Sequence, residues 1–150
     1  VAGRHEQTGL NGPLIEELAE SLEADDDANV ARQGEVSSWD TADFVEAVEA
    51  TGRNTLVIAG AWTSFCVAFP ALQATADGYD VVVVMDASGD VSKMASDVAI
   101  ERMVAEGIVP VITNTFLSEA HRTRNRPDAA EWGVLYGEVS PGFRAVTENF

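Results

Sequence analysis

Cysteine, lysine and histidine are scarce in this chain of 150 residues. It contains one cysteine, Cys66, one lysine, Lys93, and two histidines, His5 and His121. A single cysteine cannot form an internal disulfide bond, so the sequence favours a protein of a reducing compartment, the cytoplasm.

Basic residues of both kinds are also few. Nine lysines and arginines stand against 25 aspartates and glutamates, which gives a formal net charge of −16. Nucleic acids and anionic membrane surfaces bind basic patches, so the composition excludes both as expected partners. The acidic residues accompany ordinary apolar periodicity and therefore indicate an acidic surface, typical of proteins from halophilic organisms. The aspartate run 25–27 reads as a solvated loop rather than as a metal site.

Long hydrophobic runs are missing. The longest apolar segments have the length of strands, so we expect neither a transmembrane helix nor a charged-then-apolar leader. A hydrophobic content of 46% in 150 residues fits one globular domain with a sizeable core.

The most informative stretch is 54–90, which predicts a βαβ unit. Residues 55–58 form a short run rich in β-branched side chains, which predicts a buried central strand. A helix is expected to begin near Thr63 or Ser64, whose hydroxyls can cap it, and to end at Gly78. A second buried strand is predicted over 81–85.

Cys66 falls in the first turn of this predicted helix, just beyond the carboxyl end of a strand, where open α/β sheets bind ligands. Unpaired N–H groups at a helix start favour a thiolate and can hold an oxyanion. The alternative interpretation is that Cys66 is a small buried apolar residue, the commonest role of a lone cysteine.

The remaining pattern alternates strands with helices and predicts an α/β fold, a three-layer α/β/α sandwich with a mainly parallel sheet. We expect loops over 1–12 and 140–146, helices over 13–22, 41–51, 91–106, 117–126 and 128–136, and strands over 29–31 and 108–112.

The unit around Cys66 resembles the nucleophile region of the isochorismatase-like cysteine hydrolase superfamily. The residues that fall on its pattern are Gly60, Thr63, Cys66, Val67, Gly78, Tyr79, Asp86 and Ala87. The segments "NGPLIEEL", "ARQGEVSSWDTADFVEAVEATGR", "CVAFPAL" and "DASG" extend the likeness to the YcaC-like branch over nearly all of the chain. This resemblance implies a hydrolase that cleaves an amide- or imide-type C–N bond of a small molecule through a covalent thioester-like intermediate, without a cofactor.

The resemblance also implies the site residues. Cys66 takes the place of the nucleophile and Arg32 that of a basic residue, usually lysine, whose role here would be to hold the thiolate. Without the resemblance, Arg32 reads as a surface arginine. A cis peptide between Ala61 and Trp62 and an oxyanion hole from the backbone N–H groups of Trp62 and Cys66 are further implications.

Other candidate residues carry weaker patterns. Trp39 and Phe65 are predicted to line an apolar pocket, although aromatic residues lie more often in a core or an interface. A cysteine–histidine dyad is an alternative chemistry, but neither His5 nor His121 has a recognisable partner motif. The zinc-type cluster of nicotinamidase relatives has no counterpart, so we predict no metal. A flavodoxin-like ligand-binding domain would need a glycine-rich phosphate loop, which the sequence does not contain.

The resemblance implies one element that the sequence does not show, a central first strand carrying an aspartate. Asp40 reads as a helix cap and Asp86 as the end of a later strand. We therefore expect 1–150 to be a single hydrolase domain that is N-terminally incomplete, with a vacant sheet position beside 55–58 and without hydrolytic competence on its own.

Assembly is the last expectation. The resemblance implies a homo-oligomer larger than a dimer, built through the C-terminal region. Its apolar residues could equally close the monomer core, namely Phe116, Leu117, Trp132, Leu135 and Tyr136. The alternative function is a non-catalytic oligomeric binding or assembly protein of the same fold.

Overall fold

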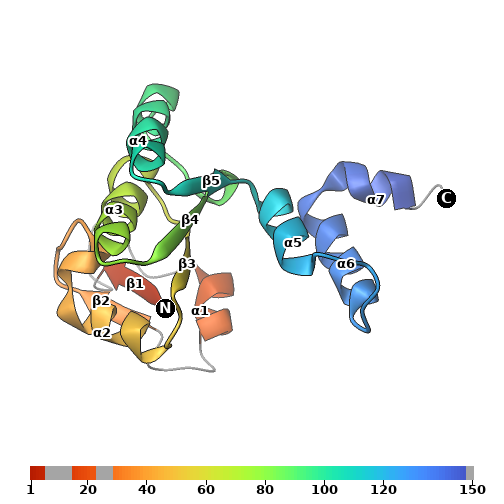
Figure 1. The fold of residues 1–150 in the computed structure, drawn as a ribbon, viewed down its shortest axis with the longest axis horizontal. Coiled ribbons are helices and arrows are strands. Elements are labelled where there is room, and N and C mark those ends of the chain that lie inside the picture. Colours follow the sequence, from red (N-terminus) through yellow and green to blue (C-terminus); the bar gives the residue numbers. More distant parts are fainter. Residues whose placement is uncertain (6–14, 23–28, 148–150) are drawn as a thin grey trace.

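The strands in the described part of this protein are all parallel and form two sheets. The computed structural model describes residues 1–5, 15–22 and 29–147 (Figure 1). The strands are β1 (Ala2–His5), β2 (Asn29–Arg32), β3 (Thr55–Ile58), β4 (Asp80–Val84) and β5 (Val109–Val111). Strand β1 pairs with β2, while β3, β4 and β5 form a second sheet in that order. Within the described ranges, no ladder of hydrogen bonds joins β2 to β3.

Helices and short helical turns connect the strands. The longer helices are α1 (Glu16–Leu22), α2 (Ala42–Ala50), α3 (Ala68–Ala76), α4 (Lys93–Ala105), α5 (Thr113–His121), α6 (Ala129–Val139) and α7 (Pro141–Thr147). The short turns are η2 (Ser38–Asp40), the π-helical η3 (Thr63–Val67) and η4 (Met85–Ala87). Helix α4 begins where the Ser92 hydroxyl accepts a hydrogen bond from the Ala95 N–H at 3.2 Å, the cap expected of a serine at this position.

The core lies between α3, α4 and the three-stranded sheet. Val67, Val83 and Met103 are fully buried there, and α3 packs against both α4 and β4. Strand β4 is central in its sheet, and its residues Val81, Val83 and Val84 are buried.

Strand β3 differs from its prediction as a buried central strand. Thr55 is exposed and 46% of the Val57 surface remains accessible. The reason is topological, since β3 lies at an edge of its sheet among the described residues and its sequence carries no sign of which neighbours it has.

The molecule has two parts, which we call the body and the arm. The body comprises the described residues up to Val111, and the arm comprises 113–147, with helices α5, α6 and α7. Figure 1 shows the arm extending away from the body. The Asp86 carboxylate links them, because it accepts hydrogen bonds from the Thr113 N–H at 2.7 Å and from the Thr113 hydroxyl at 2.9 Å.

The order of strands and helices predicted from the sequence is confirmed from residue 29 to Val139. Two predicted loops are wrong, because Ala2–His5 is a strand and Pro141–Thr147 is a helix. Neither has a strong periodic signal of its own: the first forms by pairing with β2, and the second packs against α6. Helix α5 begins at Thr113 and ends at His121, earlier than predicted at both ends. The expectations for 6–14 and 25–27 lie outside the described residues.

No helix in the described part of the chain is both long and apolar enough to span a bilayer.

Candidate active site

Cys66 lies in a tight connection that follows β3. The chain leaves Ile58, passes Gly60, and pairs Ala61 with Gly89 in a single parallel bridge before entering η3. A Cβ atom at Gly60 would approach Cγ2 of Val67 to 3.3 Å, closer than side chains usually come. The missing side chain of Gly60 therefore lets the strand end pass directly beside the turn that carries Cys66.

The loop after β4 fixes this turn. The Gly89 carbonyl accepts three hydrogen bonds, from the Trp62 N–H at 3.0 Å, the Thr63 N–H at 2.7 Å and the Thr63 hydroxyl at 3.0 Å. One residue further along each segment, the Ser64 hydroxyl donates to the Asp90 carboxylate at 2.8 Å. The Cys66 turn, which follows β3, is thus held by hydrogen bonds to the loop that follows the neighbouring parallel strand β4.

Two predictions about the oxyanion hole need correction. No peptide bond among the described residues is cis, so the cis peptide predicted between Ala61 and Trp62 is wrong; Trp62 instead has a positive φ of 89°. Its N–H donates to the Gly89 carbonyl and is not free to bind a substrate oxygen. The N–H of Cys66 as an oxyanion donor remains a prediction.

Arg32 ends β2 and lies deep in the protein, with 6% of its surface exposed. Its Nη1 donates to the carbonyl oxygens of Glu35 at 2.8 Å and Val36 at 3.2 Å. The guanidinium also acts on the Cys66 thiol through its charge and a side-chain hydrogen bond. Arg32 is therefore not the surface arginine of the alternative reading, and it meets Cys66 from the other sheet.

The thiol of Cys66 is half-buried, and this burial controls its acidity. Desolvation raises the pKa of the Cys66 thiol, and the opposing effects of Arg32 do not cancel it, so the pKa lies above its ordinary value. The direction of this shift runs against the thiolate preference predicted from a helix start. Regular helix begins only at Ala68, so Cys66 sits in the π-helical turn before it.

The two predicted pocket residues differ in their surroundings. Trp39 is 9% exposed; its ring meets Tyr79 edge to face at 5.6 Å, and its Nε1–H donates to Asp77 at 2.7 Å. It belongs to the core, so its assignment to a pocket is wrong; an aromatic residue in a loop gives no sequence signal that separates these roles. Phe65 is partly exposed and contacts the Trp62 ring at 5.5 Å, and its pocket role stays a prediction.

Sequence reasoning missed Asp90. Desolvation raises the pKa of the Asp90 carboxyl, but hydrogen bonds from the Ser64 hydroxyl, the Val91 N–H and the Ser96 hydroxyl together place it below its usual range. The carboxylate is therefore anionic at neutral pH and positions the Cys66 turn through Ser64. The signal was available, because carboxyl ends of neighbouring parallel strands meet at one edge.

The histidines and metal candidates lie elsewhere. His121 belongs to the arm, where its ring stacks on Trp132 at 5.0 Å. His5 ends β1 opposite Arg32 in the strand register, and its side chain is outside the described part. No group of three or more histidine, cysteine, aspartate or glutamate side chains in the described ranges could hold a metal ion.

Comparison with known proteins agrees with this arrangement. The sequence profile of the Isochorismatase domain matches residues 2–115, so the chain belongs to the isochorismatase family. Within it the chain is similar to YcaC proteins. It is 38% identical to the probable hydrolase YcaC of Escherichia coli K12 over 144 residues, which cover 96% of this chain and 68% of the relative.

Two solved structures extend the likeness to three dimensions. The YcaC gene product of Escherichia coli, described as an octameric hydrolase of unknown specificity, superposes with a TM-score of 0.92 at 39% identity, covering 98% of this chain and 71% of the other. YcaC from Pseudomonas aeruginosa, solved with hexane-2,5-diol and covalent acrylamide, gives a TM-score of 0.91 at 38% identity, covering 99% and 72%. The fold is therefore the α/β isochorismatase-like fold of the YcaC-like branch.

Proposed function

We propose that this protein contributes the nucleophile of a hydrolase that cleaves an amide- or imide-type C–N bond of a small molecule. The observation that carries the proposal is the meeting of Cys66 and buried Arg32 at the carboxyl ends of strands from two separate sheets. A reactive thiol beside a fixed cation at this edge is the arrangement expected of a cysteine nucleophile. The covalent acrylamide in the Pseudomonas aeruginosa relative is consistent with an electrophile-accepting protein.

The reaction proceeds in two balanced steps. The Cys66 thiolate attacks the carbonyl carbon, the C–N bond breaks, and the leaving nitrogen takes up a proton, which leaves a thioester on Sγ. Water then adds to the thioester, releasing a carboxylic acid and restoring the thiol. Arg32 stabilises the thiolate, and the Cys66 N–H stabilises the oxyanion.

The first step needs a proton acceptor, because the pKa of the Cys66 thiol is raised. Arg32 is the charge that acts on the thiol within the described residues, and it cannot readily accept a proton. The proposal therefore includes a carboxylate on a further strand seated between β2 and β3. The break between the two sheets supports this position, since β2 and β3 each leave one edge unpaired in the described ranges.

The proposal includes the setting in which the site works. A homo-oligomer larger than a dimer is supported by the octameric Escherichia coli relative. A cytoplasmic location is supported by the single cysteine, which in a reducing compartment stays available as a thiol.

The test is whether Cys66 forms and releases acyl groups. Incubation with a panel of small amides and imides, followed by acid quench and peptide mass spectrometry, should reveal an acyl adduct on the Cys66 peptide. Cys66→Ala should abolish the adduct and any turnover, whereas Arg53→Ala, an exposed substitution on the body, should change neither. Turnover by Cys66→Ala at the wild-type rate would remove the nucleophile assignment.

Labelling by iodoacetamide across pH tests the electrostatics separately. The labelling midpoint of Cys66 in this chain should lie above the ordinary thiol value of about 8.5. Arg32→Gln should raise it further, because it removes a positive charge and a hydrogen-bond donor that both lower the pKa of the thiol. An unchanged midpoint in Arg32→Gln would show that Arg32 does not act on the thiol.

The alternative is a non-catalytic assembly protein of the same fold. The raised pKa of Cys66 favours it, since a neutral thiol is a weak nucleophile. Absence of any acyl adduct, together with a stable oligomer, would select this alternative.

A further inference from the structure

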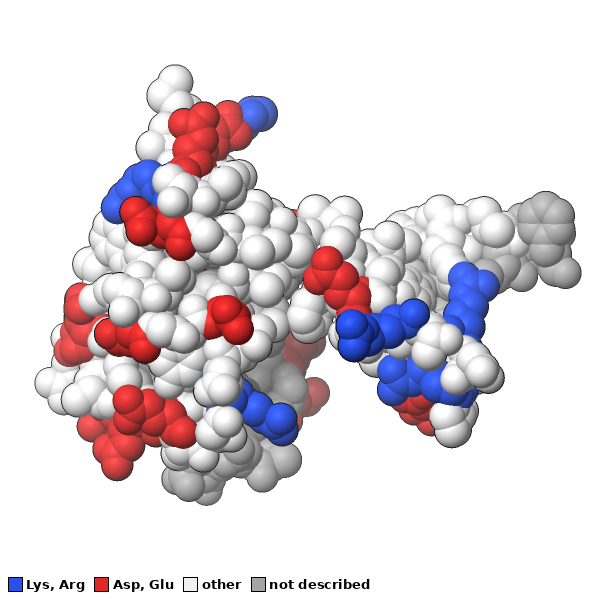
Figure 2. Space-filling view, viewed as in Figure 1, with Lys and Arg blue, Asp and Glu red and all other residues white. Residues whose placement is uncertain are grey.

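Charge is distributed very unevenly between the body and the arm. Four of the nine basic residues lie in the arm, namely Arg122, Arg124, Arg126 and Arg144. The arm also has four acidic residues, so residues 113–147 are formally neutral and the net charge of −16 belongs to the rest of the chain. Figure 2 shows this contrast, with arginines gathered on the arm and carboxylates scattered over the body.

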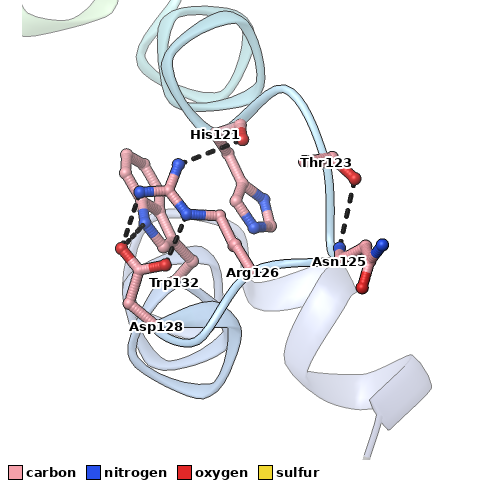
Figure 3. A network of polar contacts seen from close by, with 6 residues as sticks. All are labelled: His121, Thr123, Asn125, Arg126, Asp128 and Trp132. Carbon is pink, nitrogen blue, oxygen red and sulfur yellow. Dashed lines mark hydrogen bonds and ion pairs between the residues drawn. The ribbon is translucent and has the colours of Figure 1, made fainter.

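One of these arginines, Arg126, stabilises the arm internally. Arg126 forms an ion pair with Asp128 through Nε and donates from Nη2 to the same carboxylate at 2.7 Å (Figure 3). Its Nη1 donates to the His121 carbonyl at 3.2 Å, and the Trp132 Nε1–H also reaches Asp128, at 3.1 Å. This network closes the end of α5 onto the start of α6.

The loop inside the network has a defined shape. The Thr123 N–H donates to the His121 carbonyl at 2.6 Å, the Asn125 N–H donates to the Thr123 hydroxyl at 3.1 Å, and Arg122 has a positive φ of 57°. Arg122 and Arg124 project from this loop with exposed side chains and have no ion pair within the described part of the chain. The Arg124 guanidinium lies over the Phe143 ring, 6.0 Å from its centroid. Neither arginine has a carboxylate partner among the described residues, so in a protein with this acidic excess both can bind carboxylates.

A cavity of about 460 Å³ lies between α5, α6 and α7 next to these arginines. Its lining includes Ser118, His121, Arg122, Arg124, Tyr136 and Phe143. His121 is 6% exposed, yet its Nε2 has no hydrogen-bond partner among the described residues. A buried polar atom left without a partner costs free energy, so an incoming polar group that satisfies it would be stabilised. The two arginines and the imidazole together suit an oxyanion, whereas the Ser118 and Tyr136 hydroxyls already donate to the Asn114 carbonyl and to Ser118 Oγ.

We propose that the arm docks on the acidic body of a second copy of this chain, with Arg122, Arg124 and the adjoining cavity receiving its carboxylates. This rests on the proposed homo-oligomer. Charge complementarity favours an arm-to-body contact over an arm-to-arm contact, which would bring the unpaired arginines of two copies together. The arm also carries exposed apolar residues on α6, namely Val134, Leu135 and Val139, whose surface would be buried in such a contact.

An arm-to-body contact also explains assembly beyond a dimer. The arm and the body are different surfaces of one chain, so each copy can offer an arm to one neighbour and a body to another. Where the rotation between neighbours closes, such contacts form rings, and a closed assembly is in keeping with the octameric Escherichia coli relative.

Sedimentation velocity over a dilution series tests the proposal in about 0.15 M salt, where exposed charges still interact. Arg124→Glu and Arg122→Glu should each raise the dissociation constant of the assembly at least about tenfold, because each places a carboxylate against carboxylates. Arg53→Glu, the same change at an exposed site on the body, should leave the constant within about twofold. Far-ultraviolet circular dichroism checks that each variant keeps its helices.

The outcomes separate this proposal from the oligomer itself. A wild-type protein that stays monomeric at all concentrations would refute the proposed oligomer. A wild-type oligomer that Arg122→Glu and Arg124→Glu leave intact, or that Arg53→Glu weakens equally, would overturn arm-to-body docking. The cavity could instead bind a free anion, and calorimetry with inorganic phosphate tests this. Saturable phosphate binding that Arg124→Glu abolishes, without any change in assembly, would assign the cavity to a free anion and overturn the docking.

Discussion

The body and the arm are stabilised in different ways. The buried residues that form the hydrophobic core lie between Trp39 and Ile108, all in the body. In the described part of the arm, helix α6 has no buried residue, and the helices are held by a chain of aromatic contacts from Trp132 through His121 and Tyr136 to Phe143. The body therefore has a buried interior of its own, whereas the arm is a small cluster that exposes much of its apolar surface.

This contrast shows which part of the chain is committed to which task. The body uses parallel strands to bring Arg32, Cys66 and Asp90 to one edge of the fold. The arm uses a network around Arg126 to present Arg122 and Arg124 outward. Core substitutions should therefore act on the body as a whole, and substitutions in the arm should act locally.

The largest expected effect tests the body. Met103→Ala should lower the free energy of unfolding by about 2–5 kcal/mol, because Met103 is fully buried between α4 and the sheet. Met94→Ala provides the matched control in the same helix, since 76% of Met94 is exposed, and should change it by less than about 0.5 kcal/mol. Urea unfolding at equal protein concentration measures both. Equal losses would contradict the placement of the core.

A smaller effect is expected in the arm. Trp132→Ala removes the stack on His121, the hydrogen bond to Asp128 and the contact with the Arg126 guanidinium at 5.4 Å. Local opening of 113–147 should become easier by about 2 kcal/mol, below the cost in a full core because Trp132 is only partly buried.

Hydrogen exchange with mass spectrometry measures this opening by region. Protection should fall over 113–147 in Trp132→Ala and stay unchanged over 55–111, while the exposed substitution Glu131→Ala should alter neither. A matching loss over 55–111 would show that the arm and the body unfold as one unit.

Tryptophan substitutions in the body refine the correction made to Trp39. Trp39→Phe keeps an aromatic ring against Tyr79 but loses the hydrogen bond to Asp77, so it should cost about 1–2 kcal/mol. Trp62→Phe, at a residue that is 40% exposed, should cost less than about 0.5 kcal/mol. Thermal unfolding compares the two losses of stability. A larger loss in Trp62→Phe than in Trp39→Phe would contradict the placement of Trp39 in the core.

The secondary structure of the body was predicted well from the sequence because it depends on signals within each segment. β-Branched runs, hydroxyl caps and helix-ending glycines gave β4, β5, α2 and α4 to within a few residues. The predictions for the ends of the chain failed because their structure depends on other segments. Strand β1 forms by pairing with β2, and α7 packs on α6, and neither partner is visible in the segment itself.

The site followed the same division. The structure brings Cys66 and Arg32 together. The strand end before Cys66 indicated its position from the sequence alone, whereas Arg32 was implied only by the family resemblance. The direction of the Cys66 pKa shift, the loss of Trp62 as a donor and the role of Asp90 were not predicted. These depend on how deeply the thiol is buried and on which carbonyl faces the turn, and both are set by packing of the loop after β4.

The smallest expected effect concerns the connection between the two regions. Desolvation raises the pKa of the Asp86 carboxyl, but the N–H and hydroxyl of Thr113 and nearby backbone N–H groups together hold it below its usual range. A carboxyl with a lowered pKa stabilises the folded state fully above its ordinary pKa of about 3.9, and this stabilisation is lost as pH falls through the folded value. Acid should therefore loosen the start of α5 before it affects the core.

Hydrogen exchange at 112–117, corrected for its intrinsic pH dependence, should show lower protection at pH 3 than at pH 6. In Asp86→Asn the protection should be low at both pH values, because the amide cannot supply a charged acceptor. Asp43→Asn, on the exposed surface of α2, should keep the wild-type difference. A pH difference that survives in Asp86→Asn would mean that the arm is attached through contacts other than this carboxylate.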